Sequence, residues 1–131
     1  MSDAIQQEIE AKGLNAPRIR PEDIEANIAS EHCFTARNGV MGARWHESDE
    51  LDEIDGVSLD ELHDHNGPLG LLTFCVLVLR NGFTVTGESA CASPENFDAE
   101  VGRKVARQNA INKVWPLMGY ELRTKLTGVA A

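Results

Sequence analysis

Two β-rich runs joined by Asn81-Gly82 constrain this chain more than any other feature of its sequence. Residues 71–80 and residues 83–89 are rich in residues that favour strands, and together they enclose the Asn-Gly pair. Asn-Gly between two such runs favours a two-residue type I′ turn. The sequence therefore predicts an antiparallel β-hairpin over residues 71–89.

A two-residue turn also fixes the register, because it decides which residues of the two strands lie opposite each other. The face that carries Cys75, Leu77 and Leu79 is too apolar to stay wet, so we expect it to meet another element or a second subunit. The predicted pairs are Arg80 with Phe83, Val78 with Val85, and Val76 with Gly87. The predicted faces are Phe74, Val76, Val78, Phe83 and Val85 on one side, and Cys75, Leu77 and Leu79 beside Thr84, Thr86 and Glu88 on the other.

Helical patterns precede the hairpin. We expect a short helix over residues 3–12 that ends at Gly13, and a second one that starts at Pro21. We expect a strand over residues 31–37. The sequence as a whole predicts an α+β protein, with an N-terminal extension over residues 1–15 and a single α+β domain over residues 16–131.

A long helix is predicted after the hairpin, roughly from Phe97 to Trp115, with its start signalled by Ser93-Pro94 and its end by Pro116. A short last helix covers residues 120–126. Gly102, Ala106 and Ala110 recur every four residues and make a smooth ridge that permits close approach by a sheet or a second helix. The larger apolar positions of this helix are Phe97, Val101, Val105, Ile111, Val114 and Trp115.

The formal net charge of −9 comes from one segment. Nine acids and no Lys or Arg lie between Glu47 and Asp64, and the rest of the chain has 12 acids and 12 bases. We expect residues 38–68 to be irregular, with an acidic, solvated loop over residues 46–68 and one helical turn at Asp49–Ile54. The acidic balance argues against sequence-independent binding to nucleic acid or to anionic membranes. We also expect no sequence-specific nucleic-acid partner.

The sequence carries no pattern typical of a metal, cofactor or catalytic site. His46, His63 and His65 match no known metal-site spacing, and phosphate-binding glycine loops and nucleophile elbows are absent. The three cysteines form no C-x-x-C pair, which favours reduced thiols in a cytosolic protein. We therefore expect a protein that is not an enzyme and holds no cofactor. The N-terminus shows no signal peptide, and no apolar run is long enough to span a bilayer.

The C-terminal helical region is basic and polar. Guanidinium groups bind phosphate in a bidentate way, and aromatic rings such as Phe97, Trp115 and Tyr120 can stack on a base. The same residues would also suit an ordinary solvated helix face paired with Asp98 and Glu100. The basic and amide residues concerned are Arg103, Lys104, Arg107, Asn109, Asn112, Lys113, Arg123 and Lys125.

Three segments resemble a family of small tailed-phage proteins named after early genes of phages N4 and Sf6. They are residues 16–28, the hairpin over residues 71–91, and residues 93–126, which include the specific run N-F-D-A-E-V-G-R-K-V-A. The family is similar to the Thoeris anti-defence sponges of the first described type. This resemblance implies a binding protein in the cytoplasm of an infected bacterium, one that sequesters cyclic ADP-ribose isomers, or cyclic oligonucleotides, without turnover.

The resemblance also implies a homodimer or a hexamer with binding sites between subunits. Such a site needs a ring for adenine, amides for base edges and ribose, and guanidinium groups for the pyrophosphate. The candidate ligand-binding residues are Phe83 or Phe97 for stacking, Asn96, Asn109 and Asn112 for polar contacts, and Arg103, Arg107 and Arg123 for phosphate. An alternative is a phage early protein that inhibits a host protein, with its acidic segment occupying a basic groove.

Overall fold

The computed structural model describes residues 3–47, 53–54, 57–58 and 67–128. The helices and strands are named here in chain order. They are α1 (Asp3–Ala11), α2 (Pro21–Ala26), β1 (Ile28–Thr35), α3 (Ala36–Glu47), β2 (Glu53–Ile54), β3 (Val57–Ser58), the 3₁₀ turn η1 (Pro68–Leu71), β4 (Leu72–Leu79), β5 (Thr84–Ala90), the 3₁₀ turn η2 (Pro94–Asn96) and α5 (Ala99–Thr127).

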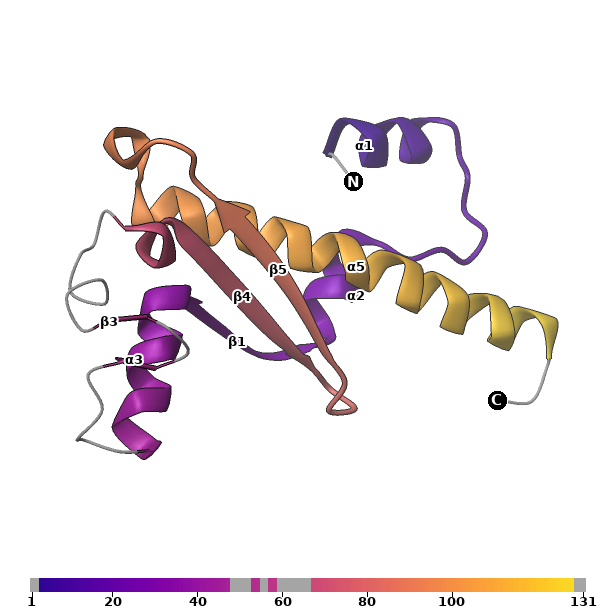
Figure 1. Cartoon of the computed structure of the whole chain (residues 1–131). Coiled ribbons are helices and arrows are strands. Elements are labelled where there is room, and N and C mark those ends of the chain that lie inside the picture. The colour runs from indigo at the N-terminus through magenta and orange to yellow at the C-terminus, as the bar shows by residue number, and fades with distance from the viewer. Residues whose placement is uncertain (1–2, 48–52, 55–56, 59–66, 129–131) are drawn as a thin grey trace.

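A three-stranded antiparallel sheet with the order β1-β4-β5 forms the centre of the fold. The long helix α5 lies across one face of this sheet and extends past it toward the C-terminus (Figure 1). Helix α3 packs at the end where β1 finishes and β4 begins. The sheet, the long helix and the short N-terminal helices confirm the predicted α+β class. The described part of the chain contains no helix whose length and apolar character would suit a membrane span.

The predicted hairpin is present, but its predicted register is wrong by one residue. Three residues separate Leu79 from Phe83, and the Leu79 amide donates to the Phe83 carbonyl at 2.8 Å. Gly82 takes a positive φ of 89°, and the Asn81 side chain accepts from the Phe83 amide at 2.9 Å. A three-residue connection with one left-handed glycine thus replaces the two-residue turn.

The shift in register moves Val85 to the other face of the hairpin. Leu77, rather than Val78, lies opposite Val85, and Cys75 lies opposite Gly87. The face that carries Cys75, Leu77 and Leu79 is buried against α5, which confirms that this face meets another element. The opposite face joins Phe74, Val76 and Val78 of β4 to Thr84, Thr86 and Glu88 of β5.

The smooth ridge of α5 is the part of the helix that enters the core. Gly102, Ala106 and Ala110 are all buried, together with Ile111 and Val114. The helix backbone touches β5 directly at Gly87: a Cβ atom built there would lie 2.1 Å from the Ala106 carbonyl oxygen and 2.3 Å from the Ala110 nitrogen. Small residues on both surfaces therefore set the distance between helix and sheet.

The predicted ends of the long helix are wrong. It begins at Ala99, where the Asp98 side chain accepts from the Val101 amide at 2.9 Å, and it runs without interruption to Thr127. Pro116 lies inside it and is exposed, so water can reach the carbonyl group that the missing N–H leaves without a helical partner. Val101 and Val105 are exposed rather than part of the buried face, because the small-residue ridge takes that place.

The expectation of an irregular segment over residues 38–68 is wrong at its start, where α3 runs to Glu47. Thr35 and Asn38 exchange hydrogen bonds that cap this helix. The side-chain oxygen of Asn38 accepts from the Thr35 backbone amide at 3.0 Å, and the Asn38 backbone amide donates to Thr35 Oγ1 at 3.1 Å. The predicted turn at Asp49–Ile54 is wrong where it is described, because β2 at Glu53–Ile54 is a strand. Most of the acidic loop over residues 46–68 lies outside the described residues.

The elements that precede the sheet agree with the sequence. Helix α1 ends before Gly13, which takes a positive φ of 67°, and α2 starts at Pro21. The strand predicted over residues 31–37 is present as β1, although it begins at Ile28 and ends at Thr35.

Replacing Gly87 by alanine should destabilise the protein strongly, because the added methyl group would overlap the α5 backbone. We expect the free energy of unfolding to fall by about 3 kcal/mol in denaturant titration. Gly119→Ala is the matched control on α5, since a Cβ there meets nothing within 4 Å. That change should stabilise the helix by about 0.5–1 kcal/mol. Equal stabilities of the Gly87→Ala and wild-type proteins would contradict the close packing.

Candidate functional site

A pocket of about 310 Å³ lies where β1, α3, β4 and the first turns of α5 meet. These elements come from three separate parts of the chain, and the antiparallel pairing of β1 with β4 brings them together. Figure 1 shows this junction at the end of the sheet beside α3. The lining residues are Cys33, Phe34, Thr35, Arg37, Asn38, Gly70, Thr73, Phe97, Ala99 and Arg103.

The pocket combines positive charge with aromatic rings. Arg37 and Arg103 supply two guanidinium groups from α3 and α5, and none of the described residues that line the pocket is acidic. Phe97 and Phe34 supply two rings, and the Phe34 ring also contacts Phe74 with a centroid separation of 5.8 Å. Cations without adjacent acids favour an anionic ligand, and ring faces favour a planar one.

Two polar atoms of residues that line the pocket have no hydrogen-bond partner among the described residues. The Thr73 hydroxyl is buried, with the residue only 2% exposed, and neither it nor Arg37 Nε makes a hydrogen bond there. Asn38 uses its side-chain oxygen to accept from Thr35, which leaves its amide N–H groups as donors. The Thr73 and Arg37 atoms lie below the surface, so the donors that this group adds to the pocket wall are those of the exposed Asn38 side chain.

Only two of the eight candidate residues from the sequence line this pocket, and they are Phe97 and Arg103. The three predicted amides lie elsewhere and are exposed. Asn109 donates to the Glu88 carbonyl of β5 at 2.8 Å, and Asn112 accepts from Gln108 at 2.9 Å. Asn96 ends the 3₁₀ turn η2 and is not a lining residue.

Phe83 and Arg123 lie far from the pocket along the fold. Phe83 follows the hairpin turn, is 56% exposed, and lines a separate hollow with Asn27 and Met118. Arg123 belongs to the same helix as Arg103, but the α-helical rise of about 1.5 Å per residue separates the two by about 30 Å. A single small ligand therefore contacts only one of these two arginines in one subunit.

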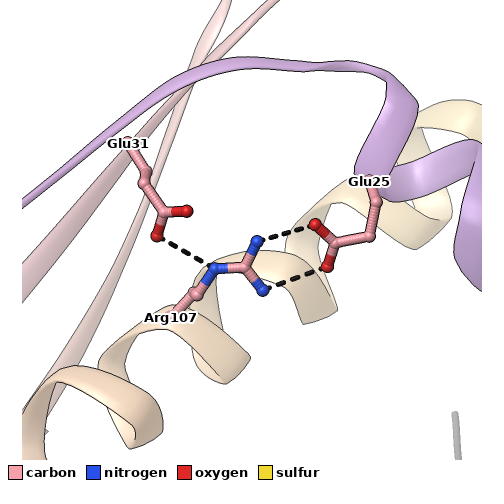
Figure 2. A network of polar contacts seen from close by, with 3 residues as sticks. All are labelled: Glu25, Glu31 and Arg107. Carbon is pink, nitrogen blue, oxygen red and sulfur yellow. Dashed lines mark hydrogen bonds and ion pairs between the residues drawn. The ribbon is translucent and has the colours of Figure 1, made fainter. Parts of the chain in front are cut away.

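Arg107 is held by two carboxylates. Its Nη1 and Nη2 donate to the two Glu25 oxygens at 3.0 and 2.7 Å, and its Nε donates to Glu31 Oε2 at 3.0 Å (Figure 2). These contacts connect α5 to α2 and to β1. Hydrogen bonds from Arg107 lower the pKa of Glu25, and those to Glu25 and Glu31 raise the pKa of Arg107. This geometry favours a structural role for Arg107, because three of its donors are used internally.

Glu31, Cys33 and Cys75 place their ligand atoms within 4.8 Å of one another, which is the one arrangement among the described residues that resembles a metal site. Two features weaken a metal interpretation. Glu31 already accepts from Arg107, and burial together with Cys33 raises the pKa of Cys75 to about 12, which disfavours the thiolate that binds metal.

The sequence interpretation missed Arg37, Asn38 and Thr73. The spacing Thr35-x-x-Asn38 is a helix-capping signal that could have placed α3 and, with it, both Arg37 and Asn38. Thr73 carries no comparable signal, since its place depends on which face of the hairpin turns toward α5.

Substituting Glu25 should reveal the ion pair through its pH dependence. We expect Glu25→Gln to lower the free energy of unfolding by about 0.5–1 kcal/mol at neutral pH. Because the pKa of Glu25 is lower in the folded protein than its ordinary value of 4.5, the wild-type protein loses this stabilisation as the pH falls below 4.5. The difference between the two proteins should therefore shrink in acid.

Urea titrations at neutral pH and at several values below 4.5 measure this difference. Glu10→Gln is the control, since Glu10 is exposed on α1 and shows no ion pair among the described residues. A difference that stays constant over the whole pH range would argue against the ion pair.

Comparison with known proteins gives one match. Neither the curated proteins nor the solved structures contain a match to this chain. The model of one protein family matches residues 19–126, a range that includes all described elements from α2 to nearly the end of α5. Since this range covers most of the sequence, the chain belongs to the phage protein (N4 Gp49/phage Sf6 gene 66) family.

Proposed function

We propose that this phage protein binds a small anionic signal derived from a nucleotide and holds it without chemical change in the cytoplasm of the infected host. Cyclic ADP-ribose isomers are the first candidates, and cyclic oligonucleotides the second. The observation that carries the proposal is the pocket in which Arg37 and Arg103 lie with Phe34 and Phe97. The likeness that we infer between this phage protein family and the anti-defence sponges supports the same ligand class.

The chemistry of the lining suits each part of such a ligand. Guanidinium groups bind phosphate oxygens with paired, charge-assisted hydrogen bonds, which are about twice as strong as neutral ones. Phe97 lines the pocket, and a purine base stacked on its ring would gain about 1–3 kcal/mol.

The size of the pocket supports a second subunit. At about 310 Å³ it is at the lower end of the range for small-molecule sites, which begins at roughly 300 Å³. Such a volume accommodates one nucleoside with its phosphate, and a ligand built from two nucleotides needs further surface. The proposal therefore includes a homodimer, or a hexamer built from dimers, in which a neighbouring copy completes the site.

Substituting Arg103 should weaken binding without harming the fold, because its side chain is exposed. Calorimetry with cyclic ADP-ribose isomers should show a dissociation constant about tenfold higher for Arg103→Gln, equivalent to about 1.4 kcal/mol. Lys104→Gln is the matched control: Lys104 is the next residue, pairs with Glu100 at 3.1 Å, and does not line the pocket. Equal losses in both variants would show a general charge effect instead of a site.

A protein that sequesters its ligand should return it intact. After incubation with the bound isomer, heat denaturation should release the same molecule in the amount that was added, as measured by chromatography and mass spectrometry. Hydrolysed or ring-opened product that increases with time would indicate an enzyme. Failure of every isomer and cyclic oligonucleotide to bind would remove the proposed function.

A further inference from the structure

Two of the three cysteines lie directly opposite each other on neighbouring strands. Cys33 of β1 pairs with Cys75 of β4, and their sulfur atoms lie within 4.8 Å. Both are free thiols in this structure. Cys75 is fully buried at 0% exposure, whereas Cys33 is half-buried and lines the pocket described above.

The hydrogen bonds of β4 show which kind of antiparallel pair this is. The Leu79 amide donates to Phe83 on the β5 side, and the Arg80 amide donates to the Asn27 carbonyl on the β1 side. Backbone groups of successive strand residues point to alternate neighbours, so those of Cys75, like those of Leu79, point toward β5. Cys33 and Cys75 therefore occupy a non-hydrogen-bonded pair.

Non-hydrogen-bonded pairs bring side chains closest together. Their Cα atoms lie about 4.5 Å apart. A disulfide spans Cα separations from about 4.4 to 6.8 Å, and the separation typical of a non-hydrogen-bonded pair falls within this range. The two sulfur atoms also differ in access: a reagent that enters from the pocket can reach Cys33, which lines it, but not the buried Cys75.

We propose that Cys33 and Cys75 are a reversible dithiol–disulfide pair, oxidised through Cys33 by a small anionic disulfide that enters the pocket. Arg37 and Arg103 line the same pocket and attract negative charge to it. The crosslink needs β1 and β4, and entry of the oxidant needs the pocket, but neither needs a bound nucleotide, so a failure of the proposed nucleotide binding would leave this proposal standing.

The exchange has two balanced steps. The Cys33 thiolate attacks one sulfur of the small disulfide, whose S–S bond breaks and releases one small thiolate, leaving a mixed disulfide on Cys33. The Cys75 thiol gives its proton to the small thiolate released in the first step, and the Cys75 thiolate attacks the Cys33 sulfur. The mixed S–S bond breaks, and the second small thiolate leaves and takes up the proton that Cys33 lost to water when it ionised. Two protein thiols are oxidised, and one small disulfide is reduced to two thiols.

Burial of Cys75 makes the second step the slower one. The pKa of its thiol is raised to about 12 by burial and by its contact with Cys33, so little thiolate is present at neutral pH. Cys33 should accordingly react first, and the mixed disulfide should be seen early in the reaction.

Oxidised glutathione added to the folded, full-length protein tests the pair. Thiol titration after denaturation should show that the Cys33–Cys75 pair consumes two of the three thiols, with any glutathione on Cys91 counted separately by peptide mapping. Peptide mapping should find a Cys33–Cys75 crosslink, and Cys91→Ser, the control, should lose two thiols in the same way. In Cys75→Ser, the reaction should stop with one glutathione on Cys33.

Three results would overturn the proposal. They are a crosslink that involves Cys91, a glutathione adduct on Cys33 that persists in the wild-type protein, and the absence of any loss of thiols under native conditions. Peptide mapping of the wild-type protein decides the matter even if a serine at buried position 75 impairs folding. Oxidation in urea provides the comparison, since the unfolded chain should form all three pairings.

Discussion

The direct contact between the α5 backbone and β5 at Gly87 sets the geometry of this protein. A helix that carries Gly102, Ala106 and Ala110 on its inner face can approach a sheet more closely than one with large side chains. On the strand, Gly87 has no Cβ atom that would overlap the α5 backbone. Larger residues then pack around this contact, with Ile24, Leu77 and Val114 among the most deeply buried. The core is thus built around a backbone contact rather than around aromatic side chains, in agreement with an aromatic content of 5%.

The sequence predicted the elements that have strong local signals. The hairpin, the helices that start with Pro21 or end before Gly13, and the small-residue ridge are all present. The predictions from the sequence were wrong where a local preference, such as that of Asn-Gly for a two-residue turn, competed with hydrogen bonds or packing elsewhere in the fold. Asn81 accepts a hydrogen bond from the Phe83 amide and Gly82 takes a positive φ, within a three-residue connection that replaces the expected turn.

The remaining errors of the fold have the same origin. Pro116 was expected to end a helix, but its exposed position and the packing of Met118 beyond it favour continuation. Gly39 and Gly42 led to the prediction of an irregular segment where α3 is present, even though Thr35 and Asn38 provide the cap of this helix. The candidate site depends on contacts between distant parts of the chain. The sequence analysis could identify Arg103 of α5 and Phe97, which lies just before that helix. Arg37 and Thr73 join them only through the pairing of β1 with β4.

Arg103 and Arg107 show how position on one helix separates binding from support. One helical turn separates them, so they project from a similar side of α5. Arg107 reaches between Glu25 and Glu31, and these two carboxylates neutralise it. Arg103 meets a part of the pocket wall that has no acid among its described residues. The charge available to an anion therefore depends on Arg103 and Arg37, while Arg107 fixes α5 against α2 and β1, and so keeps the strand that carries Cys33 in its place beside the pocket.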